Sequence, residues 1–133
     1  MRITRRTVLK SIPAFFATAF LPDRKTLLAK PEKRELLLNK FFIAGFQFYD
    51  GPGLAGRFHT GMPLSLRAEP DNAYDPFAVE ILHGRTKLGY VPRTDNKHIS
   101  RLIEQGAGLA CRIAEVDPEE RAWRMVRVEV FLA

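Results

Sequence analysis

The chain has 133 residues, enough for one domain with a modest core and too few for two. Its 46% hydrophobic and 27% charged residues are typical of a folded globular protein rather than a disordered one. The net charge of +6 suggests a nucleic-acid partner, but residues 1–29 alone carry +5 and residues 41–133 carry −1. The folded part therefore lacks a strong positive field, and any nucleic-acid site in it must be a local patch.

The N-terminal segment has the layout of a bacterial export signal. Basic residues come first, and an apolar run from Ile12 to Leu21 follows that is too short to span a bilayer. Thr4–Lys10 reads TRRTVLK and resembles the twin-arginine signal, with Val8 where that signal usually has Phe. We therefore expect residues 1–29 to direct export to the periplasm, and no stable membrane span after cleavage. An uncleaved membrane anchor is the alternative.

The next segments lead into a β-rich domain. Residues 30–40 combine mixed charge with a leucine run and are expected to form a linker. Phe41–Tyr49, which reads FFIAGFQFY, is predicted to be the first strand, with Gly45 at a bulge or a close backbone approach. The glycine-rich stretch that follows, up to Gly61, is expected to be a mobile loop.

Alternating side chains and turn signals predict five further strands. In the second one, Leu64 and Leu66 point to one face, and Ser65 and Arg67 point to the other. These strands are expected at Met62–Ala68, Phe77–Leu82, Lys87–Val91, Gly108–Val116 and Arg124–Leu132.

One segment, Thr94–Gln105, is predicted to be a helix. Ile99, Leu102 and Ile103 form its apolar stripe, and Thr94 or Asp95 is expected to cap its N-terminus. Six short strands with one α-helix between the fourth and fifth indicate a mainly β fold. We expect a small, partly open barrel, because so short a sheet must curl to bury one face.

Residues typical of catalysis or metal binding do not cluster in the sequence. Cys111 is the only cysteine and is most simply a small buried apolar residue. His59, His83 and His98 lie on different predicted elements, without partners at the spacing of a zinc site. No nucleophile stands beside a base, and no glycine-rich phosphate loop is present. We therefore expect no enzyme activity, metal or cofactor, and keep a hydrolase or zinc protein as a remote third possibility.

The stretch Glu69–Ile81, EPDNAYDPFAVEI, carries more polar and aromatic residues than a simple turn needs. Asp71 and Asn72 are common turn residues whose side chains bond their own backbone, and Pro70 and Pro76 stiffen such a loop. A purely structural turn therefore remains one interpretation of this motif.

Three segments in this order resemble the HIRAN domain: GFQFY at Gly45–Tyr49, LSLRAEPDNAYDPFAVEI at Leu64–Ile81, and KLGYVPR at Lys87–Arg93. The resemblance covers residues 41–133. It implies an OB-like six-stranded barrel, and some members of the family bind single-stranded DNA at a free 3′ end.

The resemblance also implies roles for individual residues. Phe48 and Tyr74 match two aromatic rings that clamp the terminal base, and Asp75 matches a carboxylate that accepts a hydrogen bond from the terminal 3′ hydroxyl. Asn72 matches a polar residue that holds the terminal sugar or base, and Arg93 matches a basic residue that contacts the phosphate backbone.

Two positions depart from the DNA-binding members. Gln47 replaces an arginine, which removes one phosphate contact, and Tyr90 replaces a histidine, although its ring could stack or its hydroxyl donate. Structural interpretations also stay open, because an aromatic residue in a strand, such as Phe48, usually faces the core, Tyr74 is typical of packing at a barrel end, and Arg93 of a surface charge.

The sequence thus predicts a nucleic-acid-binding module with a preference for single-stranded DNA 3′ ends. The alternative is a periplasmic module that binds a protein or a small ligand, since the periplasm holds DNA only while that DNA is taken up or secreted. This alternative predicts a cleft near Tyr74 without a basic rim.

Overall fold

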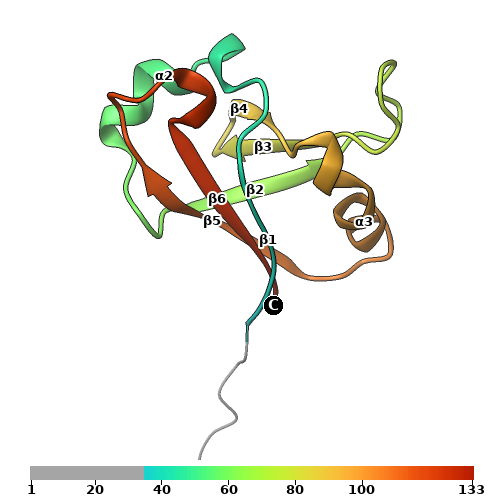
Figure 1. Ribbon diagram of the computed structural model, residues 1–133. Helices are drawn as coiled ribbons and strands as arrows, with labels where there is room; N and C mark the ends of the chain where they lie inside the picture. The colour runs from blue at the N-terminus through green and yellow to red at the C-terminus, as the bar shows by residue number, and fades with distance from the viewer. Residues whose placement is uncertain (1–34) are drawn as a thin grey trace, which may run out of the picture. The chain divides into compact units, whose positions relative to one another are not determined.

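Six antiparallel strands form one sheet in the computed structural model, which describes residues 35–133 (Figure 1). The strands are β1 (Leu36–Phe42), β2 (Pro63–Ala68), β3 (Val79–His83), β4 (Thr86–Tyr90), β5 (Leu109–Val116) and β6 (Val126–Leu132). They lie in the order β1-β6-β5-β2-β3-β4. The expected export signal and residues 30–34 of the expected linker lie outside the described residues.

The sheet curls so that its two edge strands approach each other without closing a barrel. After β1 the chain meets β4 at a single bridge, where Ala44 and Tyr90 exchange backbone hydrogen bonds of 2.8 and 2.9 Å. The predicted number of six strands is therefore confirmed, and the barrel is open between β1 and β4. Gly89, at φ 150°, makes the approach possible, because a Cβ there would lie 2.4 Å from the Ala44 carbonyl oxygen.

The core fills the inside of the curled sheet with the predicted alternating residues. Val126, Val128 and Val130 of β6 are fully buried, and Leu64 of β2 faces the same interior. Cys111 is buried among them, as predicted, and burial raises the pKa of its thiol to about 12. This thiol is a packing group.

The predicted helix is α3 (Arg93–Glu104), between β4 and β5. Ile99 is fully buried against the sheet, and the rest of the apolar stripe is half-buried. The expected cap at Thr94 or Asp95 is wrong, since the helix begins earlier, with extended Pro92 at the N-cap position and no side-chain cap.

The first strand is shifted from its predicted place. It begins at Leu36, inside the segment expected to be a linker, because Leu36–Phe42 pairs with β6 along its whole length. It also ends earlier, and the chain then turns through η1 (Phe46–Phe48), α2 (Gly51–Leu54) and η2 (Ala55–Arg57). Sequence alternation could not reveal these short helical turns.

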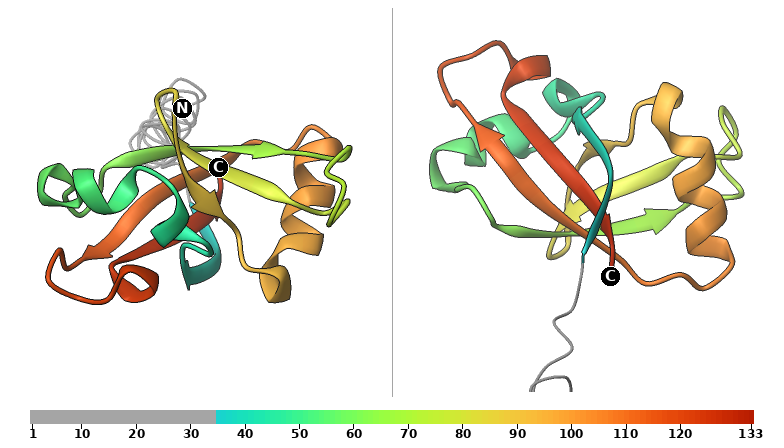
Figure 2. Two further views of the ribbon diagram at one scale, coloured as in Figure 1. Left: turned by 90° about the horizontal axis from the view of Figure 1, so that it is seen from above. Right: turned by 60° about the horizontal axis from the view of Figure 1, so that its bottom comes forward.

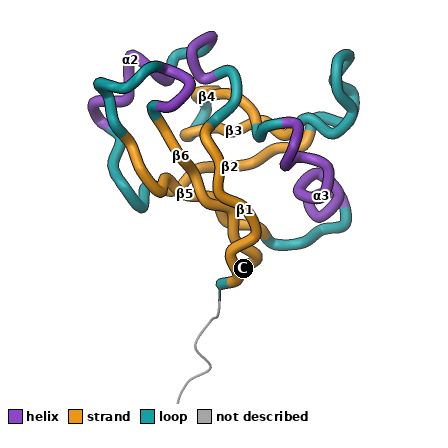
Figure 3. The backbone as a smooth tube through the Cα atoms, viewed as in Figure 1, coloured by secondary structure: helices purple, strands orange, loops and turns teal. Residues whose placement is uncertain are grey.

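The short helices gather at one end of the sheet. η1 and α2 lie there beside η3 (Ala122–Arg124), which precedes β6, whereas α3 lies toward the opposite side (Figures 2 and 3). The site described below lies between η1 and the start of α3. Within residues 35–133, no helix is long and apolar enough to cross a membrane.

Candidate functional site

Hydrogen bonds from its own backbone and from the side chain of Asn72 hold the loop between β2 and β3 in place. The Glu69 N–H donates to the Ala78 carbonyl (2.8 Å) and closes the base of the loop. The side-chain carbonyl of Asn72 accepts hydrogen bonds from the amides of Tyr74 (2.8 Å) and Asp75 (3.1 Å). The interpretation of Asn72 as a turn residue is therefore confirmed, and its acceptor oxygen is occupied inside the protein.

Asp75 is held by donors from the loop and from α3. Its Oδ1 accepts from the Phe77 amide (2.9 Å), and its Oδ2 accepts from the Asn96 side chain (2.8 Å), with Arg93 Nε 3.7 Å away. The Phe77 and Asn96 hydrogen bonds, with help from Arg93, outweigh burial and lower the pKa of Asp75 below its ordinary value. The carboxylate is therefore charged at neutral pH, and 17% of the side chain stays exposed.

Arg93 stands at the first position of α3 with an exposed side chain. One of its terminal nitrogens donates to the Tyr74 carbonyl at 3.4 Å, a weak bond at that length. A guanidinium carries five N–H donors, so most of them remain available beyond these two contacts within residues 35–133. Arg93 therefore adds a charged donor to the rim of the site.

Two aromatic side chains project from the surface. Tyr74 is 87% exposed, and Phe48 is 77% exposed on η1. The interpretation of Phe48 as a core residue is wrong, because the chain leaves the strand before this point. Gly45, at φ 72°, starts a helical turn that directs Phe46 into the core and Phe48 outward.

Tyr90, on β4, lies between Phe48 on one side of the site and Asp75 on the other. Its ring packs edge-on against Tyr49, with 6.3 Å between centroids. Its hydroxyl accepts from Lys87 Nζ (2.6 Å) and donates to Glu69 (2.9 Å). Burial and the bond to Glu69 raise the pKa of Tyr90, although Lys87 acts in the opposite direction, so the hydroxyl keeps its proton.

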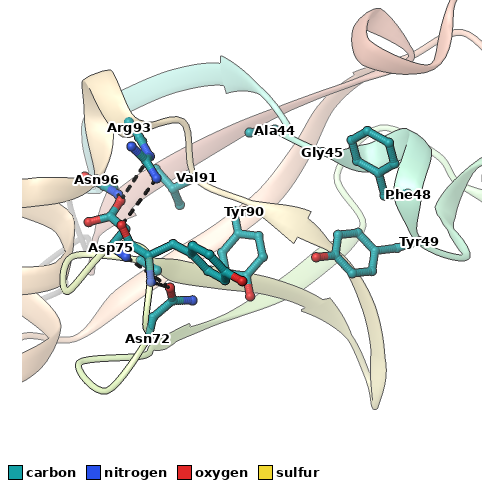
Figure 4. Close-up of a pocket in the computed structure, with 12 residues that line it drawn as sticks. Ala44, Gly45, Phe48, Tyr49, Asn72, Asp75, Tyr90, Val91, Arg93 and Asn96 are labelled. Carbon is teal, nitrogen blue, oxygen red and sulfur yellow. Dashed lines mark hydrogen bonds and ion pairs between the residues drawn. The ribbon is translucent and has the colours of Figure 1, made fainter.

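All six residues predicted from the sequence line one pocket of about 640 Å³. They are Phe48, Asn72, Tyr74, Asp75, Tyr90 and Arg93. Phe48 and Tyr49 stand on one side of the pocket and Asp75, Arg93 and Asn96 on the other, with Tyr90 between them (Figure 4). The pocket thus combines exposed aromatic rings, a charged acceptor and a basic donor.

Several residues of the site were missed by sequence reasoning. Asn96 is buried and holds Asp75, and its position three residues after Arg93 on a helix was a usable signal, because that spacing shares a face. Glu69 could not be found this way, since its bond to Tyr90 joins residues 21 positions apart. Lys87 is only three residues before Tyr90 on β4, but residues three apart on a regular strand point to opposite faces, so this spacing gave no signal. Trp123 does not line the pocket, but it is 51% exposed on η3, which contacts η1, and no local pattern indicated that these two short helices are neighbours.

Among the described residues, no group of three His, Cys, Asp or Glu side chains is arranged to hold a metal ion. The pocket itself presents one carboxylate, Asp75, and it is already bonded to Asn96 and the Phe77 amide.

Comparisons with known proteins agree on the fold. A protein from Lactobacillus plantarum is similar, with 22% identity and a TM-score of 0.64 over 74% of this chain and 94% of that one. The HIRAN domain of human HLTF is also similar, with 15% identity and a TM-score of 0.58 over 73% of this chain and 78% of that one. A search of curated proteins found no match. The model of the HIRAN domain matches residues 38–133, so this chain belongs to the HIRAN family, which is known for nucleic-acid binding.

Proposed function

We propose that this domain binds the 3′-hydroxyl end of single-stranded DNA in the pocket between η1 and α3. The observation that carries the proposal is the meeting, in that one pocket, of two exposed aromatic rings with the charged carboxylate of Asp75. Exposed aromatic side chains are costly to leave in water, and a nucleobase is a flat partner for them. Membership of a nucleic-acid-binding family supports the same class of ligand.

In this proposal Phe48 and Tyr74 stack on the terminal base. Base stacking on an aromatic side chain contributes about 1 to 3 kcal/mol per base and tolerates any sequence. The Tyr74 ring is free to do this because the loop is fixed through its backbone, while the ring makes no hydrogen bond within residues 35–133.

Asp75 supplies the preference for a hydroxyl end. A charged carboxylate accepts a hydrogen bond from a 3′ hydroxyl and repels a 3′ phosphate. Each of its oxygens is already an acceptor for one protein donor, and a second lone pair on each remains. Arg93, on the same rim, donates to the phosphate that precedes the terminal nucleotide.

The hydrogen bonds of Asn72 support a different task from the one implied by the resemblance. Its Oδ1 holds two loop amides, and its Nδ2 donates to Glu69 at 3.0 Å. We therefore propose that Asn72 shapes the loop, and that it contributes at most its second N–H to the ligand.

Titration of residues 30–133 into labelled single strands tests this function. Strands that end in a 3′ hydroxyl should bind more tightly than otherwise identical strands that end in a 3′ phosphate. Tyr74→Ala should weaken binding to both, by about 1 to 3 kcal/mol. Absence of binding at high micromolar protein would reject the nucleic-acid proposal, and equal affinity for both ends would reject the role of Asp75.

The alternative considered from the sequence, a periplasmic partner protein or small ligand, has no support in the comparisons. The structure also differs from what that alternative predicts, since the cleft beside Tyr74 has a basic residue, Arg93, on its rim. One arginine does not decide between the partners, and the titration above does.

A further inference from the structure

A chain of side-chain hydrogen bonds connects β4 to the loop that carries Tyr74 and Asp75. Glu69 Oε1 accepts from the Tyr90 hydroxyl (2.9 Å) and from Asn72 Nδ2 (3.0 Å). Asn72 Oδ1 in turn accepts from the amides of Tyr74 and Asp75. The two residues proposed to contact the terminal nucleotide are therefore linked to β4 through two intermediate side chains.

Lys87 fixes the direction of this chain. Its Nζ lies 2.6 Å from the Tyr90 hydroxyl oxygen, 3.4 Å from Glu80 Oε2, and over the rings of Tyr49 and Tyr90 at 5.0 and 4.4 Å. An ammonium group can only donate, so the Tyr90 hydroxyl accepts from Lys87 and uses its own hydrogen for Glu69. The hydroxyl therefore has no hydrogen left for a ligand.

Glu69 is a charged acceptor in this arrangement. Burial opposes its ionisation, but the hydrogen bonds from Asn72 and Tyr90, with the charges of Lys87 and Arg67, lower its pKa overall. Hydrogen bonds to an ionised acceptor are stronger than neutral ones. Glu69 therefore holds Asn72 and Tyr90 together more firmly than a neutral side chain would.

We infer that Lys87, Tyr90 and Glu69 are positioning residues that hold the β2–β3 loop in its ligand-ready conformation. The geometry gives Tyr90 this task through its hydroxyl, in place of a direct hydrogen bond to the ligand. A loop that is already ordered loses less conformational entropy on binding, so the positioning strengthens affinity without adding a contact. The consequence for affinity rests on the proposed function, whereas the ordering of the loop concerns the protein alone.

Tyr90→Phe in the full chain tests the ordering directly, because it removes one hydroxyl and keeps the ring. Amide hydrogen exchange of Tyr74 and Asp75, measured by NMR without ligand, should become about tenfold faster. Tyr49→Phe is the matched control for exchange, because it removes the hydroxyl of the neighbouring ring, which makes no hydrogen bond within residues 35–133. Unchanged exchange in Tyr90→Phe, with the rest of the spectrum intact, would overturn the inference.

A double-mutant cycle tests whether Glu69 and Tyr90 act as one unit. Glu69→Gln alone should speed the same two amides, and the double variant Glu69→Gln with Tyr90→Phe should exchange no faster than the faster single variant. Independent, multiplying effects would contradict a shared chain of bonds.

Affinity for a 3′-hydroxyl single strand separates this inference from the proposed function. If the wild-type chain binds, Tyr90→Phe should weaken binding several-fold and should lower the affinity for 3′-hydroxyl and 3′-phosphate strands by the same factor. A loss of affinity with unchanged amide exchange would mean that the hydroxyl contacts the ligand, which overturns the inference. If the wild-type chain binds no strand, the proposed function fails and the exchange experiment still decides whether the loop is held in this way.

Discussion

Asp75 shows how one side chain can serve both the loop and its proposed ligand. It caps the end of the loop through the Phe77 amide and joins the loop to α3 through Asn96. The same bonds keep it ionised and leave part of its surface open to the pocket. Structural and binding interpretations of this residue are therefore compatible, since the contacts that hold it also prepare its charge.

The lowered pKa of Asp75 predicts a pH-dependent contribution to stability. The carboxylate stabilises the fold above its ordinary pKa of 3.8, and this contribution is lost as the pH falls through the lower folded-state value. Asp75→Asn should therefore lower the Tm at neutral pH, and the gap from wild type should shrink in acid. Thermal unfolding from about pH 7 to about pH 3 measures the gap.

Asp71→Asn is the control for this measurement. It changes an exposed carboxylate of the same loop that makes no hydrogen bond within residues 35–133. Its Tm should stay close to that of the wild type at neutral pH. A gap for Asp75→Asn that stays constant down to the lowest pH would contradict the assignment of the effect to the carboxylate charge.

If the domain binds single strands, we expect Trp123 to contact a strand that is long enough to extend past the pocket. It is a half-exposed aromatic residue on η3, next to η1 and therefore on the Phe48 side of the pocket, and Arg121 stacks on its ring at 5.5 Å. Since Trp123 is the only tryptophan, its fluorescence reports this place alone. Binding of a single strand several nucleotides long should quench the fluorescence, and Trp123→Ala should weaken that strand by about 1 to 3 kcal/mol. Affinity for a dinucleotide that is weakened as strongly would show that the effect is structural.

The Ala44–Tyr90 bridge, which connects the segment after β1 to β4, depends on a single glycine, Gly89. Gly89→Ala would place a methyl group against the Ala44 carbonyl oxygen and force an alanine into a conformation that favours glycine. We expect a loss of unfolding free energy of about 1 to 3 kcal/mol in chemical denaturation. Gly56→Ala, where an added Cβ meets nothing within 4 Å, should change it by less than about 1 kcal/mol. Equal effects of the two variants would mean that the Ala44–Tyr90 bridge does not limit stability.

Elements with a clear hydrophobic period were predictable, and those fixed by distant pairing were not. The sequence shows the alternation of Val126, Val128 and Val130, and these residues face the core on β6. It also shows the apolar stripe of α3, which packs on the sheet through Ile99. The position of β1 did not, because its leucines form a strand only when β6 is beside them. η1 was hidden inside an apolar run for a similar reason, since its turn depends on Gly45 and on the approach to β4.

The six site residues were predicted from motifs, whereas their supporting contacts were not. Motif spacing indicated Tyr74 and Asp75 because both lie in one continuous loop. The links to Asn96 and from Tyr90 to Glu69 join residues 21 positions apart, and only the folded chain brings them together. The sequence thus predicted which side chains line the pocket, and the structure reveals what holds them in position.

For the whole molecule, export and nucleic-acid binding are separate proposals that need separate tests. Residues 1–29 fused to a reporter should direct it to the periplasm, and Arg5→Lys with Arg6→Lys should block that export if the twin-arginine pathway recognises the pair. The localised reporter activity of the two fusions measures the effect. Unimpaired export of the double variant would assign the segment to another pathway.

The distribution of charge predicts an unusually weak salt dependence for a nucleic-acid-binding domain. Residues 41–133 have a net charge of −1, and Arg93 is the basic residue that lines the pocket. Each neutralised phosphate of a single strand adds about −0.7 to the slope of log affinity against log salt, so we expect a slope between about −0.7 and −1.4 for residues 30–133. Arg93→Gln should bring the slope nearer to zero by about 0.7, and the full chain should show a steeper slope because residues 1–29 add +5. Titrations at several salt concentrations measure the slopes of residues 30–133, of their Arg93→Gln variant and of the full chain. If residues 30–133 show a steep slope and Arg93→Gln leaves it unchanged, the strand binds away from this pocket.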